Sequence, residues 1–97
     1  MVRRYYDLPS LAALEAFEAS ARHLSFKVAA SELESTSGEI RRQIKAIEGE
    51  LGVRLIEGPG ADVVLTSAGE DLYRLLASSF SRASEVLRIM KRCDWTG

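Results

Sequence analysis

Residues 25–52 read SFKVAASELESTSGEIRRQIKAIEGELG, and the apolar residues in this segment recur with helical spacing. Ser25 is a good N-cap for a short helix, which ends before the polar turn at residues 35–38. Thr36 and Glu39 have the spacing of a capping box and predict the start of a second helix. This second helix has an apolar stripe and then a glycine stop: Ile40, Ile44, Ile47, Leu51 and Gly52. Two helices joined by a tight turn predict a helix-turn-helix.

Regular patterns continue on both sides of this segment. Apolar residues at every third or fourth position predict a first helix over about residues 9–22, with Pro9 in its first turn. On the other side, a long helix is predicted to begin with Ser67 as its N-cap and to end at Lys91 or Arg92.

Two short extended pieces, residues 53–56 and 62–65, are joined by a tight connection and predict a β-hairpin. The predicted fold is therefore mainly α: a winged helix-turn-helix of three helices and a short hairpin wing, followed by a long C-terminal linker helix. The expected divisions are a DNA-binding domain at residues 8–65, a linker or dimerisation helix at 66–92 and a tail at 93–97.

Composition narrows the class of protein. The chain has 97 residues and a formal net charge of −1. Its single cysteine, Cys93, excludes an internal disulfide and favours a cytoplasmic location, where thiols stay reduced. Its apolar runs are far shorter than the roughly 20 residues of a membrane span, and it has no signal-peptide pattern. The small size argues against an enzyme, and the isolated His23 argues against a metal site or His-based catalysis; no cofactor is expected.

Cations gather on the face of the second helix that lies away from its isoleucine stripe. On a helical wheel, Arg42 lies nearly opposite the stripe, and Lys45 lies to one side of Arg42. We expect Ser37 and either Arg41 or Arg42 to contact base edges in a major groove. The candidate DNA-binding residues are Ser25, Lys27, Thr36, Ser37, Gly38, Arg41, Arg42, Lys45 and Arg54. The alternative is an ordinary solvated helix face; the turn, the hairpin and the capped start favour DNA.

The charge balance limits the expected affinity. Residues 22–54 hold six cations against five acidic residues. Glu39 is close enough to pair with Arg42, although a capping-box role that turns Glu39 towards the helix terminus is favoured. Beyond Arg54 in its first arm, the predicted wing has no Lys or Arg, so the rest of the wing could approach a minor groove only through its backbone. We expect modest, salt-sensitive binding that needs two half-sites.

The long helix carries an apolar stripe that the small preceding body cannot cover along its full length. The first turns of this stripe are expected to pack on the helix-turn-helix, and the later turns to pack on a second copy in a homodimer. The candidate dimerisation residues are Leu72, Leu76, Phe80, Ala83, Leu87 and Met90. The alternative occupant is a different protein.

Several segments in this order resemble LysR-type transcriptional regulators. They are LPSLAALEAFEASARHLSF (residues 8–26), VAASEL (28–33), RQIKAIE (42–48), ELGVRL (50–55) and LTSAG (65–69). The resemblance implies a DNA-binding winged helix-turn-helix and a linker helix that dimerises.

This chain also departs from the LysR pattern. Members usually have Gln, then Ser or Pro, then Ala where this chain has Ser37, Gly38 and Glu39, and a Ser is common where it has Arg41. Members also have a basic wing and an effector domain that this sequence lacks. We therefore expect no small-molecule effector site in this chain, and control by abundance or by a protein partner.

Two hypotheses follow. The first is a homodimeric, sequence-specific regulator that binds double-stranded DNA at a roughly palindromic site, with residues 36–51 in the major groove. The second is a winged-helix interaction module that partners another regulatory protein and has weak or no DNA binding of its own. The bare wing and the near-neutral charge favour the second hypothesis, and the cations of the second helix favour the first.

Overall fold

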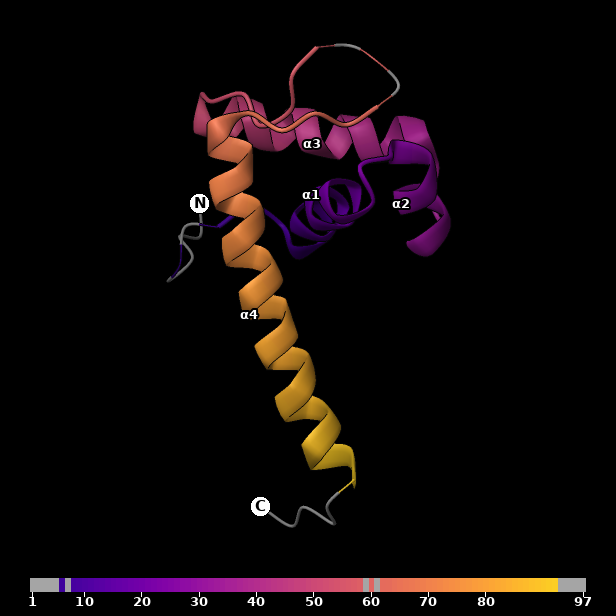
Figure 1. The fold of residues 1–97 in the computed structure, drawn as a ribbon, viewed down its shortest axis with the longest axis vertical. Coiled ribbons are helices and arrows are strands. Elements are labelled where there is room, and N and C mark those ends of the chain that lie inside the picture. Colours follow the sequence, from indigo (N-terminus) through magenta and orange to yellow (C-terminus); the bar gives the residue numbers. More distant parts are fainter. Residues whose placement is uncertain (1–5, 7, 59, 61, 93–97) are drawn as a thin grey trace, which may run out of the picture.

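The computed structural model describes residues 6, 8–58, 60 and 62–92, and these residues form four α-helices. The helices are α1 (Leu11–His23), α2 (Phe26–Glu32), α3 (Ser37–Leu51) and α4 (Ser67–Arg92). Helices α1, α2 and α3 form a compact body, and α4 runs beside α1 and projects well beyond that body (Figure 1). The prediction of a mainly helical chain is confirmed. The predicted tail at 93–97, with Cys93 and Trp95, lies outside the described residues.

The hydrophobic core lies where α1, α2 and α3 meet the two arms of the wing. Its largest fully buried apolar side chains are Phe17, Ile40, Ile47 and Leu55. Three of the four residues in the predicted α3 stripe are buried. The fourth, Leu51, is 48% exposed because it is the last residue of the helix, where the chain turns away through Gly52 at a positive φ of 71°.

Hydroxyl side chains cap the first three helices. Ser25 and Thr36 cap α2 and α3 as predicted. The predicted start of α1 at Pro9 is wrong, because the helix begins two residues later and Ser10 is its N-cap. The Ser10 hydroxyl accepts a 3.1 Å hydrogen bond from the Ala13 backbone N–H. Proline has no side-chain acceptor for such a bond, so the cap falls on the serine.

The fourth helix is also capped one residue earlier than predicted. Thr66 Oγ1 accepts a 3.0 Å bond from the Gly69 backbone N–H, so Thr66 is the cap and Ser67 is the first helical residue. Gly69 packs directly on the wing, because a Cβ at this position would lie 2.1 Å from the Leu55 carbonyl oxygen. This close contact fixes the start of α4 against the first arm of the wing.

The wing is a hairpin with very little β-pairing. The arms predicted at residues 53–56 and 62–65 pair through one antiparallel bridge, between Ile56 and Leu65. Within the described part of the wing, this pairing does not extend into a strand.

Groups outside the hairpin also hold the two arms. The backbone N–H groups of Leu55 and Ile56 both donate to Glu48 Oε2, at 2.8 and 3.1 Å. On the returning arm, Asp62 forms its bridge with Ser25 at the start of α2. The wing is therefore held by α3 and by the start of α2 as well as by its own backbone pairing, in which the Glu57 N–H donates to the Val64 carbonyl oxygen at 2.8 Å and the Thr66 N–H donates to the Leu55 carbonyl oxygen at 3.0 Å.

Helix α4 divides into a packed half and a bare half. Leu76 is buried, whereas residues 81–92 are all exposed. The Cα radius of gyration is 15.0 Å, larger than the roughly 12.5 Å expected for a compact chain of this length. Among the described residues, no helix is both long enough and apolar enough to cross a membrane.

Candidate nucleic-acid interface

Helix α3 presents the face opposite its buried isoleucines to solvent. Arg42 is on this face with 69% of its side chain exposed. Gly38 and Lys45 are also exposed, and Ser37 is half-buried. The structure thus brings together four of the residues that the sequence placed at the DNA-binding surface.

Arg42 forms an ion pair with Glu39 on the same helix. Its Nε donates to Glu39 Oε1 at 2.9 Å, and its Nη2 donates to Oε2 at 2.5 Å. The hydrogen bond from Arg42 lowers the pKa of Glu39, and the same bond raises the pKa of Arg42. Both groups therefore remain charged near neutral pH.

This pair corrects the predicted capping box. The Thr36 hydroxyl accepts from the Glu39 backbone N–H at 3.1 Å, so the first half of the box is confirmed. Among the described residues, however, no bond returns from the Glu39 carboxylate to Thr36. A guanidinium one turn further on offers two charge-assisted bonds where the backbone offers one neutral donor, and the stronger pairing prevails.

Arg41 lies away from the exposed face and towards the wing. Its guanidinium carbon is 4.3 Å from the centre of the Phe26 ring, and its Nη2 donates to the Gly60 carbonyl oxygen at 3.2 Å. The side chain therefore forms a cation–π contact with α2 and a hydrogen bond with the wing. Of the two arginines proposed for base contacts, only Arg42 has the exposed placement that this role requires.

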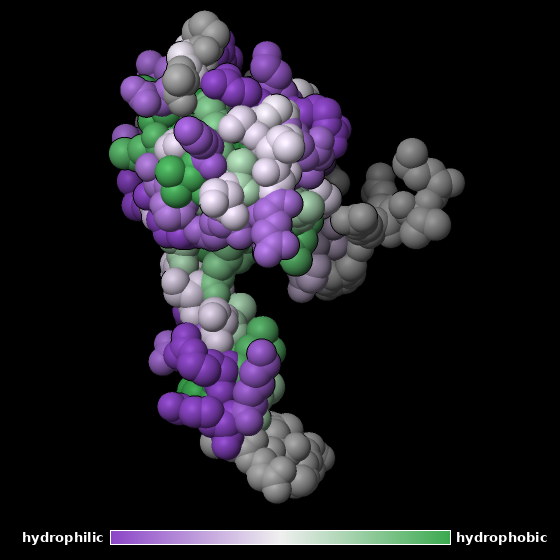
Figure 2. Space-filling view, turned by 90° about the vertical axis from the view of Figure 1, so that its right-hand side faces the viewer, coloured by the Kyte–Doolittle hydropathy of each residue, from purple (hydrophilic) through white to green (hydrophobic). Residues whose placement is uncertain are grey.

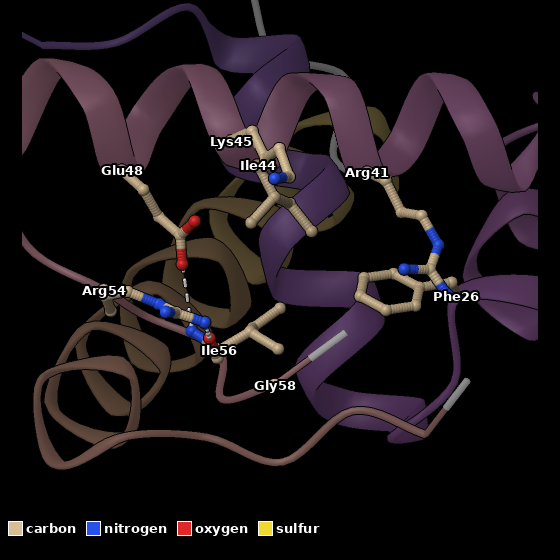
Figure 3. Close-up of a pocket in the computed structure, with 8 residues that line it drawn as sticks. All are labelled: Phe26, Arg41, Ile44, Lys45, Glu48, Arg54, Ile56 and Gly58. Carbon is tan, nitrogen blue, oxygen red and sulfur yellow. Dashed lines mark hydrogen bonds between the residues drawn. The ribbon is translucent and has the colours of Figure 1, made fainter. Parts of the chain in front are cut away.

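A cavity of about 480 Å³ lies between α3 and the first arm of the wing (Figure 3). Its lining residues are Phe26, Arg41, Ile44, Lys45, Glu48, Arg54, Ile56 and Gly58. Three of these are cations. The single acid, Glu48, is turned to the wing backbone by the two bonds described above. The groove therefore has an excess of positive charge although the chain as a whole does not.

The two lysines proposed for phosphate contacts are free to make them. Lys27 and Lys45 are exposed, and within the described residues neither has a hydrogen bond or an ion pair. Arg54 is exposed too, with one 3.3 Å bond from Nη2 to the Ile56 carbonyl oxygen. The Ser25 and Thr36 hydroxyls accept cap bonds, which leaves each O–H hydrogen available to a phosphate.

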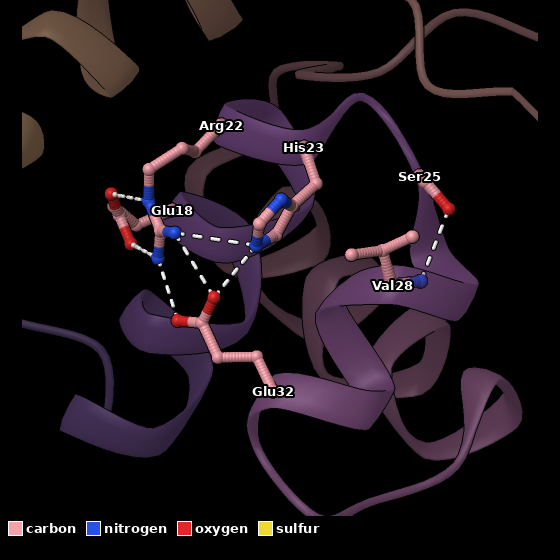
Figure 4. A network of polar contacts seen from close by, with 6 residues as sticks. All are labelled: Glu18, Arg22, His23, Ser25, Val28 and Glu32. Carbon is pink, nitrogen blue, oxygen red and sulfur yellow. Dashed lines mark hydrogen bonds and ion pairs between the residues drawn. The ribbon is translucent and has the colours of Figure 1, made fainter.

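A polar network joins α1 to α2 and was not predicted from the sequence (Figure 4). Arg22 lies between two carboxylates, with Nε 2.9 Å from Glu18 Oε2 and Nη2 2.7 Å from Glu32 Oε2. His23 Nε2 lies 2.6 Å from Glu32 Oε1. The hydrogen bonds from Arg22 and then from His23 lower the pKa of Glu32 to about 2, and the bonds from Glu18 and then from Glu32 raise that of Arg22. Arg22 is therefore a structural cation rather than part of the DNA-binding charge.

The candidate dimerisation residues separate into two groups. Leu76 is buried, and Leu72 and Phe80 are half-buried against the core. Ala83, Leu87 and Met90 are exposed. The expectation that the first turns of α4 cover the helix-turn-helix is confirmed, and only the second group remains open to a partner.

The open part of α4 borders a groove of about 650 Å³ against α1. Its apolar lining residues are Leu11, Phe80, Ala83 and Leu87. In the space-filling view, hydrophobic patches lie on the projecting helix beyond the body, beside hydrophilic side chains that cover much of its lower part (Figure 2). Val86, Ile89 and Met90 add to this exposed apolar surface.

Comparison with known proteins finds sequence relatives over most of the chain. Residues 11–70 match the model of the bacterial regulatory helix-turn-helix proteins of the lysR family. The HTH-type transcriptional activator AmpR of Yersinia enterocolitica is 46% identical over 87 residues, which cover 90% of this chain and 29% of AmpR. The HTH-type transcriptional regulator TrpI of Pseudomonas aeruginosa is 43% identical over 86 residues, 89% of this chain and 29% of TrpI.

Solved structures agree with this match. The crystal structure of the BenM_DBD/catB site 1 DNA complex has a TM-score of 0.77 at 30% identity, covering 91% of this chain and 97% of that one. The oxidized form of Corynebacterium glutamicum OxyR has a TM-score of 0.73 at 33% identity, covering 88% of this chain and 27% of that one.

The three-helix body, the bridged wing and the exposed face of α3 define a winged helix-turn-helix protein. The chain belongs to the lysR family of bacterial regulatory helix-turn-helix proteins. It spans 29% of the length of each of the two curated relatives above.

Proposed function

We propose that this chain is a transcriptional regulator that binds double-stranded DNA in the bacterial cytoplasm, with α3 in the major groove. The observation that carries the proposal is the exposed face of α3, where Arg42 and Lys45 face solvent above a buried isoleucine stripe. The BenM_DBD neighbour, which the chain matches over 97% of its length, was solved in complex with DNA. An α-helix with one free face fits the width of a major groove.

Each candidate DNA-binding residue has a proposed role. Arg42 and Ser37 contact base edges, and Lys45, Lys27 and Arg54 contact phosphates. The caps of α2 and α3, at Ser25 and Thr36, add backbone and hydroxyl donors to phosphates. Gly38 has no atom within 4 Å of the position that a Cβ would take, which leaves room for the DNA to approach its backbone closely.

The regulator acts as a homodimer on a roughly palindromic site. The exposed apolar residues of α4 form the interface, and the groove beside α1 widens it. A two-fold dimer places two α3 helices on two half-sites, and avidity then compensates for the near-neutral charge of each copy. Residues 8–65 form the DNA-binding unit and residues 66–92 the linker.

The proposal is tested by selecting bound sequences from random double-stranded DNA with the purified chain. The expected result is an enriched inverted repeat, which reports sequence reading and two-fold symmetry together. The absence of enrichment would contradict the proposal.

A second candidate is an interaction module that partners another regulator and binds DNA weakly. The observation that favours it is that both arginines of α3 contact the chain's own groups: Arg41 contacts Phe26 and Gly60, and Arg42 contacts Glu39. If the selection enriches nothing and the chain forms a stable heterodimer with another winged-helix regulator, this candidate replaces the first.

A further inference from the structure

The Arg42–Glu39 pair uses one particular edge of the guanidinium. The Nε and Nη2 atoms donate to the two carboxylate oxygens in a side-on bidentate pair. A guanidinium has five N–H donors, so this pairing leaves both Nη1 hydrogens and the second Nη2 hydrogen free. Those three hydrogens belong to the two terminal nitrogens of a side chain that is 69% exposed.

Glu39 is itself held in place from the other side. Gln43 Nε2 donates to Glu39 Oε2 at 3.0 Å, and the Glu39 backbone N–H is bonded to the Thr36 hydroxyl at 3.1 Å. The carboxylate also lies in the first turn of α3, where the helix dipole favours a negative charge. Glu39 therefore fixes the direction of Arg42 before any ligand is present.

From this geometry we propose that Glu39 is a specificity-determining positioning residue, which holds Arg42 end-on to a guanine in each half-site. The inference rests on the proposed function of α3 as the major-groove helix. The free Nη1 and Nη2 hydrogens of Arg42 match guanine O6 and N7, the bidentate pairing that arginine makes with bases. Because Glu39 has already ordered the side chain, less rotamer freedom is lost on binding.

The carboxylate has a second effect on DNA that lacks this guanine. Without the base contact, the negative charge of Glu39 faces the duplex and opposes its phosphates. Glu39 therefore weakens binding to non-cognate DNA while it supports the cognate contact. It lowers affinity in general and raises discrimination at one base pair.

The test compares the wild-type chain with Glu39→Gln, Arg42→Ala and the control Glu50→Gln. Glu50 is an exposed residue near the other end of α3, so its substitution removes the same charge from the same helix. Dissociation constants are measured by fluorescence anisotropy on the duplex selected by the wild type, and on duplexes in which each guanine of a half-site is replaced in turn. Helical content and thermal midpoint are recorded for each variant to confirm folding.

We expect the discrimination at one guanine to depend on both Arg42 and Glu39. Arg42→Ala abolishes discrimination at that base pair. Glu39→Gln lowers the discrimination there by about tenfold and strengthens binding to the non-cognate duplexes. Glu50→Gln shifts all affinities together and leaves the ratio unchanged.

Two results would overturn the inference, and they are distinguishable. If the wild type selects an inverted repeat but Glu39→Gln discriminates as well as the wild type or better, the pair does not position Arg42. The proposed function would then survive without the inference. If the wild type selects no sequence, the inference about Glu39 and the proposed function are both wrong.

Discussion

Arg41 and Arg42 are neighbours in the sequence, yet they lie on different sides of α3. Consecutive residues of a helix are separated by about 100°, so Arg41 turns to the Phe26 ring and the wing while Arg42 turns to solvent beside Glu39. The sequence alone placed Arg42 opposite the isoleucine stripe, and this is confirmed. It could not assign Arg41, because the Phe26 ring and the Gly60 carbonyl approach it only through the tertiary fold.

Two glycines of α3 provide a matched test at the residue scale. A Cβ at Gly38 or at Gly49 would meet no atom within 4 Å, so alanine fits at both positions. Each substitution is expected to leave stability unchanged or to raise it by about 0.5–1 kcal/mol, measured by urea unfolding. Only Gly38→Ala is expected to weaken binding to the selected duplex, because only that position faces the DNA in the proposed complex. Equal affinities for the two variants would contradict this placement of Gly38.

Most of the secondary structure was predictable from local pattern. The isoleucine stripe, the Ser25 and Thr36 caps and the Gly52 stop all depend on neighbours within a few residues in sequence. The anchoring of the wing to α3 was not predictable, because it depends on the Glu48 carboxylate, which accepts from the N–H groups of Leu55 and Ile56 only in the tertiary fold. Only one ion pair of the Arg22 network can be predicted from the sequence. The i, i+4 spacing of Glu18 and Arg22 indicates an ion pair within one helix. The contact of Arg22 with Glu32 depends on the angle between α1 and α2.

The contact between α4 and the wing gives a prediction at the scale of elements. Gly69→Ala places a methyl group 2.1 Å from the Leu55 carbonyl oxygen, so the backbone of one element must shift. We expect a loss of about 1–3 kcal/mol in the free energy of unfolding, as for other overpacked sites. Gly49→Ala is the control, since it makes the same change in open space. A Gly69→Ala variant as stable as wild type would contradict the observed close packing.

The ion-pair network between α1 and α2 predicts how the stability of the chain depends on pH. The pKa of Glu32 is about 2 in the folded chain, below its ordinary value of 4.5. Its contribution to stability is therefore complete above about pH 4.5 and is lost as the pH falls from there towards 2. Because the pair is partly exposed, this contribution is expected to be about 1 kcal/mol or less. Urea unfolding should find Glu32→Gln less stable than wild type at pH 7 and nearly equal to it at pH 2. The control Glu34→Gln should be as stable as wild type at both pH values. If Glu32→Gln lost the same stability at pH 7 and at pH 2, the low pKa of Glu32 would not be the cause.

At the scale of the whole molecule, the projecting half of α4 is the proposed dimer interface. Leu87 is 56% exposed and borders the groove beside α1. Leu87→Glu is expected to convert the dimer into a monomer in sedimentation, because a carboxylate would enter an apolar interface. Its affinity for the selected duplex is expected to fall by about a hundredfold or more as avidity is lost.

A matched control for Leu87→Glu lies on the opposite face of the same helix. Ser78 is exposed and nine residues earlier, about 180° away around the helix axis. Ser78→Glu introduces the same side chain and is expected to remain dimeric with unchanged affinity. A dimeric Leu87→Glu variant would contradict the proposed interface.

The most direct measurement is the salt dependence of binding to the selected duplex, because phosphate contacts set its slope. Removal of Lys45 together with Arg42 (Arg42→Ala/Lys45→Ala) is expected to weaken binding strongly and to reduce the slope of log affinity against log salt by about one per copy. The control Arg82→Ala/Arg92→Ala removes the same charge from exposed positions on α4 and should leave the slope unchanged. Equal effects of the two double variants would contradict the claim that the free face of α3 binds DNA.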